Sequence, residues 1–317
     1  MIKTKRQKKS FGMFGKKAKI FYCLMLIFPI LQFSFFYIGV NFNSVILAFQ
    51  KYELADGQLK LVWAGIENIT QFFRWVTDGS AFGYLLKNTL IIYVIGLFVG
   101  LGGGLCFSYY IHKRRAFSKF YRVILFLPSI LSAIVLSLMW DKFLNDGIIN
   151  ILRDLLGKPE LHDLRYTAGR QFAMVACFTV LMGFGSSVLL FTGTMDQIDE
   201  SVEEYVQLDG CTPFKEFFLV TLPLIFPTVR TFVVLGVGGI FMNQAYMLNF
   251  YSLGDPGDAA APYSIFGYFL FRDMYNPTTS LTEYPYMAAC GVILTFVSAP
   301  LTFGVKYLLE RFGPKED

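Results

Sequence analysis

Charged side chains are scarce in this sequence. Asp, Glu, Lys and Arg make up 16% of its 317 residues and hydrophobic residues 55%, whereas soluble domains carry roughly 25% charged residues. The five cysteines form no C-x-x-C pair and there are two histidines, which disfavours metal sites and a disulfide framework. The G-x-x-x-x-G-K-S/T loop that binds nucleotide phosphates is also missing. We therefore expect a non-catalytic chain without cofactor or metal.

The hydrophobic residues are concentrated in six long runs. Each is close to the roughly 20 residues that a helix needs to cross a bilayer, which predicts an all-α polytopic membrane protein with six transmembrane helices. No A-x-A site follows the first run, so we interpret it as a retained anchor and not as a signal peptide. The predicted spans are 20–40, 88–111, 123–140, 172–193, 224–248 and 285–302.

The distribution of basic residues predicts the orientation. With the N-terminus in the cytoplasm, the inner segments carry 18 of the 28 Lys and Arg residues, as the positive-inside rule requires, and both termini are cytoplasmic. The basic segment 1–19 is then interpreted as topogenic charge that also attracts anionic lipid, not as a nucleic-acid site. A six-span domain, 20–305, and a cytoplasmic tail, 306–317, follow it.

The predicted spans contain almost no ionisable side chains. Arg230 is the exception, and it is close enough to a cytoplasmic end to reach water. Carriers driven by H⁺ or Na⁺ usually keep an acid or a histidine in the membrane, and a membrane-embedded hydrolase needs paired acids or a nucleophile. Any energy must therefore come from a partner. A structural or receptor-like membrane protein without transport activity stays open as an alternative.

Small residues recur along three of the predicted spans. Gly96, Gly100 and Gly104 are spaced four residues apart in the second span. Gly183 and Gly185 lie in the fourth span, and Gly236, Gly238 and Gly239 lie in the fifth. Small residues on one face of a membrane helix allow close approach of a neighbouring helix, so we expect these glycines to serve helix packing.

The predicted cytoplasmic segment 195–223, here called the acidic hairpin, departs from the positive-inside pattern. Acidic residues contribute little to orientation, so their number favours either a basic partner surface or a solvated acidic loop. The segment has a single lysine, Lys215, against seven acids, which are Asp196, Asp199, Glu200, Glu203, Glu204, Asp209 and Glu216.

The local pattern of the acidic hairpin predicts a helix, a sharp turn and a second helix. Residues 201–204 form a capping box at the start of the first helix, and Gly210 is placed to end it in a left-handed conformation. Thr212 and Pro213 are the preferred cap and first residue of the next helix, which we expect to end at residues 222–223. Such a hairpin would project rigidly from the bilayer.

The same residues resemble a known signature. The acidic hairpin is similar to the E-A-A-x-x-D-G-A…L-P-x-x-x-P pattern of permease subunits of binding-protein-dependent ABC importers, although Tyr205 and Val206 replace two alanines. The matching positions are Glu204, Asp209, Gly210, Leu222, Pro223 and Pro227.

Further motifs resemble the sugar-transporting, maltose-permease-like branch of that family. Residues 63–68 are similar to its W-x-G-x-x-N element, and residues 88–90 are similar to its N-T-L element. Residues 252–256 resemble its T-x-G-G-P turn, with Asp255 in place of a glycine. Residues 284–289 resemble its Y-G-Y-A-x-A element, with Pro285 in place of a glycine. The resemblance covers nearly the whole chain.

The resemblance implies a permease subunit in the plasma membrane of a bacterium that imports a carbohydrate. A second, different permease would complete the pathway, two ATPase subunits would bind beneath, and an extracellular solute-binding protein would dock outside. Glu204 would pair with a basic residue of an ATPase groove, and Asp209 and Gly210 would shape the turn. Leu222 and Pro223 would join the hairpin to span five, so that closure of the ATPases moves the spans.

A sugar site in the membrane needs hydroxyl-bonding groups and aromatic faces. The candidates are polar residues of spans four and five, which could equally form hydrogen bonds between helices. These tentative substrate-pathway residues are Ser186, Ser187, Asn243, Gln244 and Tyr246.

Overall fold

The protein is helical along most of its length. The computed structural model describes residues 16–55, 57–79, 81–157, 170–251, 263–275 and 281–314. The motif at 252–256, His162 and most of the basic segment 1–19 lie outside the described residues. Four stretches of π-helix, η2 to η5, continue neighbouring α-helices, as π turns commonly do inside longer helices.

The elements of the first half are α1 (Lys16–Gln32), η2 (Phe33–Gly39), α2 (Val40–Leu47), β1 (Gln50–Ala55), β2 (Gln58–Trp63), α3 (Glu67–Asp78), α4 (Phe82–Ile95), η3 (Gly96–Gly102), α5 (Gly103–His112), α6 (Ser118–Ile130), α7 (Ala133–Lys142), η4 (Phe143–Ile148) and α8 (Ile149–Leu156). Those of the second half are α9 (Gln171–Met195), α10 (Glu200–Leu208), α11 (Pro213–Glu216), η5 (Phe217–Thr221), α12 (Leu222–Gly238), α13 (Met247–Tyr251), α14 (Phe266–Tyr275), the 3₁₀ turn η6 (Leu281–Glu283) and α15 (Tyr284–Phe312).

Five of the six predicted spans are continuous helices long and apolar enough to cross a bilayer. All five extend beyond the predicted bounds at one end or both, because the helices run on into polar flanking residues. They are Ile20–Leu47, Phe82–His112, Gln171–Met195, Pro213–Gly238 and Leu281–Phe312.

The third predicted span, 123–140, is not one straight helix. It is divided between α6 and the helix that runs from α7 to α8, and the two are bent by 105°. Leu131 and Ser132 take extended backbone conformations at the break. Pro128 has no N–H to donate to the carbonyl one turn earlier, which weakens the end of α6. Hydropathy alone could not show this break, because the apolar run continues across it.

The fifth span also differs from its prediction of 224–248. Its helix starts at Pro213, runs through η5 and ends at Gly238, so residues 222–223 do not separate the acidic hairpin from the span. The wider π turn of η5 precedes Pro223 and relieves the clash that a proline ring makes inside a regular α-helix. Beyond Gly238 the chain turns through Ala245 and Tyr246, which both have positive φ.

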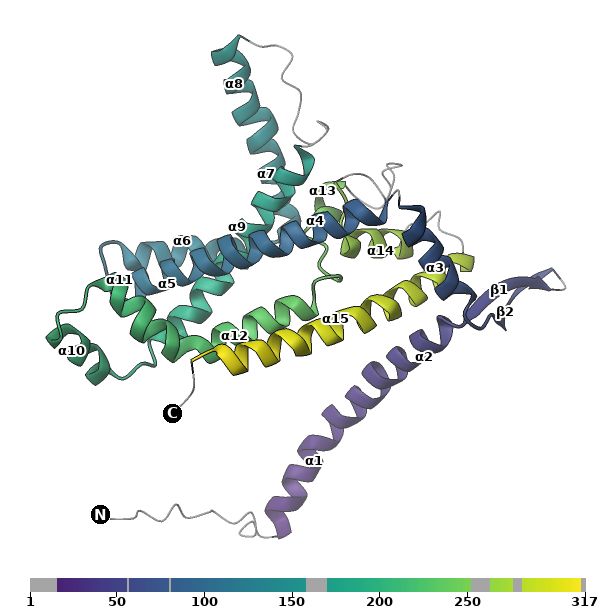
Figure 1. Ribbon diagram of the computed structural model, residues 1–317, viewed down its shortest axis with the longest axis horizontal. Coiled ribbons are helices and arrows are strands. Elements are labelled where there is room, and N and C mark those ends of the chain that lie inside the picture. The colour runs from purple at the N-terminus through teal and green to yellow at the C-terminus, as the bar shows by residue number, and fades with distance from the viewer. Residues whose placement is uncertain are drawn as a thin grey trace.

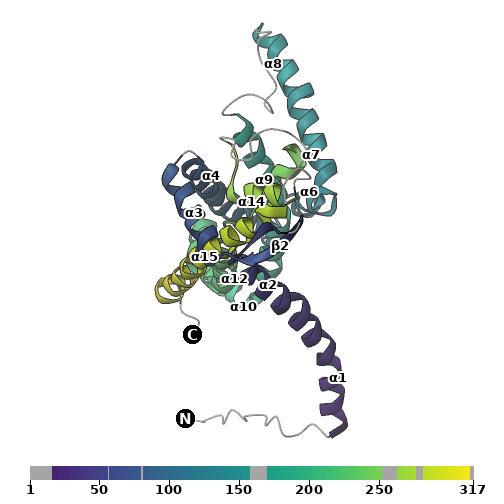
Figure 2. The ribbon, with the colours of Figure 1, turned by 90° about the vertical axis from the view of Figure 1, so that its right-hand side faces the viewer.

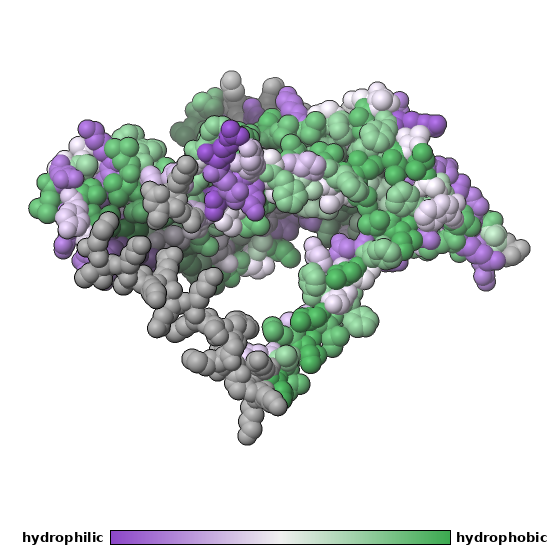
Figure 3. Space-filling model, turned by 60° about the horizontal axis from the view of Figure 1, so that its bottom comes forward, coloured by the Kyte–Doolittle hydropathy of each residue, from purple (hydrophilic) through white to green (hydrophobic). Residues whose placement is uncertain are grey.

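The spans form an elongated bundle with different structures at its two ends. Helices α4, α5, α9, α12 and α15 run along the bundle, and α10 and α11 lie at one end, here called the hairpin end (Figure 1). The strands β1 and β2, with α3 and α14, lie at the opposite end. Hydrophobic residues cover α1 and much of the bundle, whereas hydrophilic residues gather toward the ends (Figure 3). This distribution suits a bundle that crosses a bilayer lengthwise.

The first span stands apart from the bundle. Figures 1 and 2 show α1 leaving the other helices at an angle, and none of its most apolar 18-residue window is buried. Its surface is almost wholly apolar, so lipid or another helix must cover it.

A two-stranded antiparallel hairpin follows the first span, an element that the all-α prediction missed. Ala55 pairs with Gln58 across a tight turn in which Gly57 has φ of +73°. The buried amide of Asn68 donates to the carbonyls of Ala48 (2.9 Å) and Gln50 (2.8 Å). The last residue of the W-x-G-x-x-N element therefore holds this hairpin against α3.

The N-T-L element joins two segments that are far apart in the sequence. The Asn88 amide donates to the carbonyl of Ser264 (3.0 Å), and the Thr89 hydroxyl accepts the backbone N–H of Phe266 (3.1 Å). All of these groups are buried, where an unpaired polar group would cost free energy. These two bonds fix α14 against α4.

Only some of the glycines expected to serve helix packing do so. A Cβ on Gly185 would collide with the carbonyl oxygen of Leu125, and one on Gly104 would approach Ser187 to 3.3 Å. Around Gly96, Gly100 and Gly183, by contrast, a Cβ would meet nothing within 4 Å. Within the described part of this chain, these three residues therefore make no close contact with a neighbouring helix.

The close approach of α6 to α9 predicts a strong dependence on residue 185. We expect Gly185→Ala to destabilise the full chain by about 1–3 kcal/mol, because the added methyl group has no room against the α6 backbone. Gly193→Ala is the matched control on the same helix, since a Cβ there meets nothing within 4 Å. Thermal unfolding in detergent checks both variants. Equal midpoints would contradict the predicted backbone contact.

Candidate functional site

The acidic hairpin is built from two helices joined by a glycine turn. The first arm is α10, and the second arm begins with α11 and continues into α12. Gly210 lies between the arms with φ of +66°, a conformation that glycine adopts without steric cost. The N–H of Cys211 donates to the carbonyl of Val206 (3.3 Å) and closes the end of the first arm, as in a Schellman motif.

The cap of α10 differs from the predicted capping box. Asp199, not Ser201, precedes the helix, and its Oδ1 accepts the backbone N–H (2.9 Å) and the hydroxyl (2.8 Å) of Ser201. These bonds lower the pKa of the Asp199 carboxyl. An aspartate at this position also interacts favourably with the positive end of the helix, so it outcompetes the serine two residues later.

The tip of the acidic hairpin exposes both acidic and apolar side chains. Glu204, Asp209 and Gly210 are all exposed. Leu208 is 84% exposed, and large parts of three hydrophobic side chains beside the acids reach the surface, those of Tyr205, Leu208 and Phe214. This surface lies beyond the end of the bundle (Figure 1), where lipid tails do not cover it if the spans cross the bilayer. Exposed apolar groups of this kind mark interaction sites.

The base of the acidic hairpin is held by ion pairs to neighbouring elements. The Lys113 Nζ lies 2.8 Å from Glu203 Oε2 and 2.5 Å from Glu216 Oε1. His112 lies between Asp196 and Glu203, and Arg122 pairs with the second oxygen of Asp196. We call these residues the ion-pair cluster: His112, Lys113, Arg122, Asp196, Glu203 and Glu216.

The ion-pair cluster changes two acid–base equilibria. Partial burial opposes the charge of Glu203, but the hydrogen bond and charge of Lys113 and the charge of His112 lower its pKa below the usual 4.5. Burial likewise opposes the charge of Lys113, yet hydrogen bonds to Glu203 and Glu216 raise its pKa above 10.5. The Glu203 contribution to stability is lost as the pH falls through the lowered value, and the Lys113 contribution is lost as the pH rises through the raised one. Both persist at neutral pH.

The ion-pair cluster gives a new explanation for some of the acidic residues in the acidic hairpin. Asp196, Glu203 and Glu216 pair with basic residues of this same chain, so a partner is not needed to explain them. Glu200, Glu204 and Asp209 remain exposed on the hairpin. The sequence showed the basic residues of 112–122 and the acids of 195–223 separately, but nothing in it indicated that they meet.

Leu222 and Pro223 lie where the second arm enters the bundle. Both are partly buried, and Leu222 packs against a buried cluster at the hairpin end that includes Leu105, Phe191 and Ile225. The hydroxyl of Tyr109 also donates to the carbonyl of Pro213 (3.1 Å). The second arm is thus attached to α5 and α9 as well as to its own helix.

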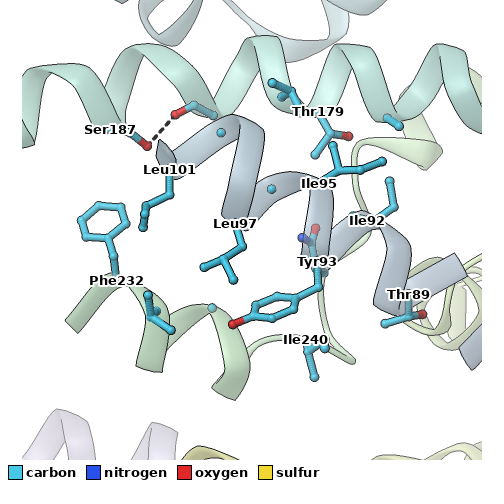
Figure 4. Close-up of a pocket in the computed structure, with 18 of the residues that line it drawn as sticks. Thr89, Ile92, Tyr93, Ile95, Leu97, Leu101, Thr179, Ser187, Phe232 and Ile240 are labelled. Atoms are coloured by element: carbon cyan, nitrogen blue, oxygen red, sulfur yellow. Dashed lines mark hydrogen bonds between the residues drawn. The ribbon is translucent and has the colours of Figure 1, made fainter. Parts of the chain in front are cut away.

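A second candidate site is a cavity of about 250 Å³ inside the bundle. It lies between α4 with η3, α9 and α12 (Figure 4). Most of its lining is apolar, and four glycines widen it. The polar residues that line it are Thr89, Tyr93, Thr179, Ser187 and Asn243, and the glycines are Gly96, Gly100, Gly183 and Gly236.

The structure brings together some of the predicted pathway residues. Ser187 and Asn243 line the cavity, and the Ser187 hydroxyl donates to the carbonyl of Gly183 (2.9 Å). Ser186, Gln244 and Tyr246 are not among the lining residues. The ring of Tyr246 packs edge-to-face on that of Phe178, in the hydrophobic core.

Three of the polar lining residues, Thr89, Tyr93 and Thr179, were not predicted from the sequence. Thr89 belongs to the N-T-L element, and its spacing of four residues from Tyr93 places both on one helix face. Thr179 lies on α9, where its hydroxyl donates to the carbonyl of Val175 (2.8 Å) or to that of Ala245 (3.0 Å). Thr89 and Tyr93 lie on the same helix face as the four-residue glycine repeat of the second span. That repeat could therefore have identified both residues from the sequence.

Comparison with known proteins identifies the family. The family model described as binding-protein-dependent transport system inner membrane component matches residues 92–315. The chain belongs to this family. The matched region contains the acidic hairpin and most of the cavity lining. It begins after Thr89, within the second span.

Relatives of this transport family are similar over most of their length. The probable ABC transporter permease protein YesP of Bacillus subtilis is 27% identical over 237 residues, which cover 74% of this chain and 73% of YesP. The arabinooligosaccharides transport system permease protein AraP of Halalkalibacterium halodurans is 21% identical over 315 residues, covering 98% of this chain and 94% of AraP. The alignment with AraP includes the first span.

Solved structures of ABC transporters share the fold. A chain of a bacterial ABC transporter involved in the import of the acidic polysaccharide alginate superimposes with a TM-score of 0.74 at 18% identity. The match covers 93% of this chain and 97% of that chain. The helical architecture of this inner membrane component is therefore similar to that of an ABC transporter chain.

The left-handed conformation at residue 210 predicts how the turn responds to substitution. Gly210→Val should destabilise the turn by about 1–2 kcal/mol, because a β-branched residue is strained at positive φ. Gly210→Asn is the matched control, since asparagine tolerates this region, and a Cβ at residue 210 meets nothing within 4 Å. Hydrogen exchange of amides 200–216 in nanodiscs should be faster in the valine variant alone. Similar exchange in both variants would show that the backbone conformation does not matter.

Proposed function

We propose that this chain is one permease subunit of a bacterial ABC importer for carbohydrates, driven by separate ATPase subunits. The acidic hairpin carries the proposal, because its tip exposes Tyr205, Leu208 and Phe214 beyond the end of the bundle. Membership of the transport family supports the importer role. A relative named for arabinooligosaccharide transport supports a carbohydrate as the solute.

The proposed orientation places the hairpin end in the cytoplasm of a plasma-membrane protein. The segments assigned to that side carry most of the Lys and Arg residues, which favours this side for the hairpin and both termini. The strands β1 and β2 and the helix α3 then lie outside the cell. There they can meet a solute-binding protein, and a structural neighbour of this chain has been solved in complex with an alginate-bound periplasmic protein.

The proposed ATPase contact is the tip of the acidic hairpin. Glu204 is exposed on the first arm next to Tyr205 and Leu208, so a groove with a basic residue and apolar walls would complement it. Asp209 and Gly210 form the turn that sets the angle between the arms. Because α11, η5 and α12 are one continuous helix, displacement of the tip moves the span that lines the cavity. Leu222 and Pro223 lie on this path.

The proposed solute pathway includes the cavity inside the bundle. Asn243 and Ser187 supply hydrogen-bonding groups, and Tyr93 supplies an aromatic face of the kind that packs on sugar rings. The cavity of about 250 Å³ is smaller than most ligand sites, which fits one half of a pathway completed by a second permease. We leave Ser186, Gln244 and Tyr246 out of the pathway, because none of them lines the cavity. The ring of Tyr246 packs on Phe178, and the exposed Ser186 donates its hydroxyl to the carbonyl of Gly183 (3.2 Å).

The first span supports assembly with a second permease. It carries Gln32, Ser34 and Asn43 on an exposed helix, and polar side chains in a membrane favour contact with another helix over contact with lipid. We propose that the first span packs against a second, different permease and that two ATPase subunits bind the pair.

Reversal of charge at the hairpin tip tests the coupling. In the assembled transporter, we expect Glu204→Lys to abolish solute-stimulated ATPase activity and uptake, because it places a positive charge against a basic groove. Insertion and expression should be unchanged, since residue 204 is exposed. Glu310→Lys, an equal charge change on an exposed residue of α15, is the control. Normal stimulation in the Glu204 variant would remove the hairpin from the coupling mechanism.

Filling the cavity tests the solute pathway. We expect Gly100→Leu to remove most of the uptake while leaving the thermal unfolding midpoint unchanged, because the side chain would occupy open space and leucine favours a helix. Gly193→Leu is the control, on a helix position that does not line the cavity. Uptake of a labelled solute into proteoliposomes is the measurement. Full uptake by the Gly100→Leu variant would contradict the pathway.

A further inference from the structure

The ion-pair cluster joins five elements at the hairpin end. His112 and Lys113 end α5, Arg122 lies on α6, and Asp196 follows α9. Glu203 and Glu216 lie on the two arms of the acidic hairpin. The cluster therefore connects the second span to both arms, at residues that the proposed ATPase contact does not use.

The geometry around His112 constrains its protonation state. Its Nδ1 lies 2.9 Å from Asp196 Oδ1, and its Nε2 lies 2.7 Å from Glu203 Oε1. Both ring nitrogens thus face carboxylate oxygens at hydrogen-bond distance. A neutral imidazole has one N–H and one lone pair, so one of the two contacts would set a lone pair against a carboxylate.

Solvent cannot easily relieve that conflict, because the His112 side chain is only 8% exposed. Both contacts are satisfied when the ring carries two N–H groups and donates one to each carboxylate. With this second proton the cluster is electrically balanced, since His112, Lys113 and Arg122 oppose Asp196, Glu203 and Glu216. Without it, the cluster keeps one uncompensated negative charge beside the largely buried side chains of His112 and Lys113.

Lys113 makes a second connection between the arms. Its side chain is 13% exposed, and its ammonium group bridges Glu203 on α10 and Glu216 on α11. The neighbouring Tyr109 donates to the backbone carbonyl of Pro213 at the start of the second arm. One turn of α5 therefore touches the first arm, the second arm and the segment that leads into the acidic hairpin.

We propose that His112 and Lys113 are positioning residues of the acidic hairpin, with His112 doubly protonated between Asp196 and Glu203 and Lys113 bridging Glu203 and Glu216. They act through these three acids, and the hairpin base moves together with the second span. The effect of these residues on transport rests on the proposed function, whereas the contacts themselves do not.

Because His112 contacts both carboxylates only with two N–H groups, the stability of the hairpin base should depend on pH. Histidine is the side-chain type that ordinarily changes charge between pH 5 and 8. Asp196 and Glu203 contact the ring and favour the second proton. The adjacent Lys113, which pairs with Glu203 and Glu216, and Arg122, which pairs with Asp196, oppose it, and the neutral Tyr109 lies on the same helix. Loss of that proton removes one of the two contacts and loosens the hairpin base.

The protonation state can be measured directly. The chain has two histidines, so ¹⁵N-histidine labelling of the full chain in nanodiscs gives two sets of ring signals, and His162→Gln assigns them. We expect both His112 nitrogens to be protonated at pH 7. A neutral His112 ring at pH 7 would overturn the proposal.

Hydrogen exchange tests whether the residues position the hairpin. In nanodiscs, His112→Gln and Lys113→Met should each speed the exchange of amides 200–208 by about tenfold or more, the effect of losing one charged hydrogen bond. Lys113→Arg should keep wild-type exchange. The double variant His112→Gln with Glu203→Gln should recover protection, because the new amide at position 203 donates to the amide oxygen introduced at position 112. Unchanged exchange in both single variants, or no recovery in the double variant, would overturn the proposal.

Activity measurements separate this inference from the proposed function. In the assembled transporter, the ratio of ATP hydrolysed to solute imported should rise in the wild type as His112 loses its second proton, and stay high and pH-independent in His112→Gln. If the exchange results hold while this ratio is unaffected, the hairpin base is held as described but coupling through the hairpin is wrong. If exchange does not respond, the positioning role is wrong whatever the transport result.

Discussion

Pairing of charges at the hairpin end is the interaction on which the rest of the structure depends. Three carboxylates and three basic groups meet where α5, α6, α9 and both arms of the acidic hairpin converge. Removal of Lys113 or Glu216, whose side chains are 13% and 10% exposed, would leave a partner charge largely shielded from water, which costs more than the loss of a surface ion pair. These pairs therefore tie the start of the second arm, which continues through η5 and α12 toward the cavity, to the end of α5.

Hydropathy predicted the membrane spans well because length and apolarity are the two properties that a bilayer selects. It could not predict the bend after Ile130, since both sides of the break are apolar. Nor could it predict that the helix of the fifth span begins at Pro213, because a π turn accommodates Pro223 inside a continuous helix. The strands β1 and β2 had a usable signal in the Asp-Gly pair between two alternating runs, which was outweighed by the helical character of the rest.

The candidate site was only partly predictable for a similar reason. The arms of the acidic hairpin follow from local cap and turn residues, whereas the ion-pair cluster depends on contacts between residues some 90 positions apart. In the cavity, Asn243 and Ser187 could be proposed from polarity alone, whereas Thr89 and Tyr93 could be found only by following the helix face of the glycine repeat in the second span. The motif residues Asn68 and Asn88 proved to be structural, since their amides satisfy buried carbonyls that connect distant segments.

The glycines of the cavity have a consequence for how solute range can evolve. Much of the open volume exists because Gly96, Gly100 and Gly183 have no side chain, so almost any single substitution at these positions makes the space smaller. Enlargement would instead require shortening residues such as Tyr93 or Phe232, whose rings also contribute to packing. Mutation can therefore narrow the range of accepted solutes in one step, while acceptance of bulkier ones needs compensating changes elsewhere in the bundle.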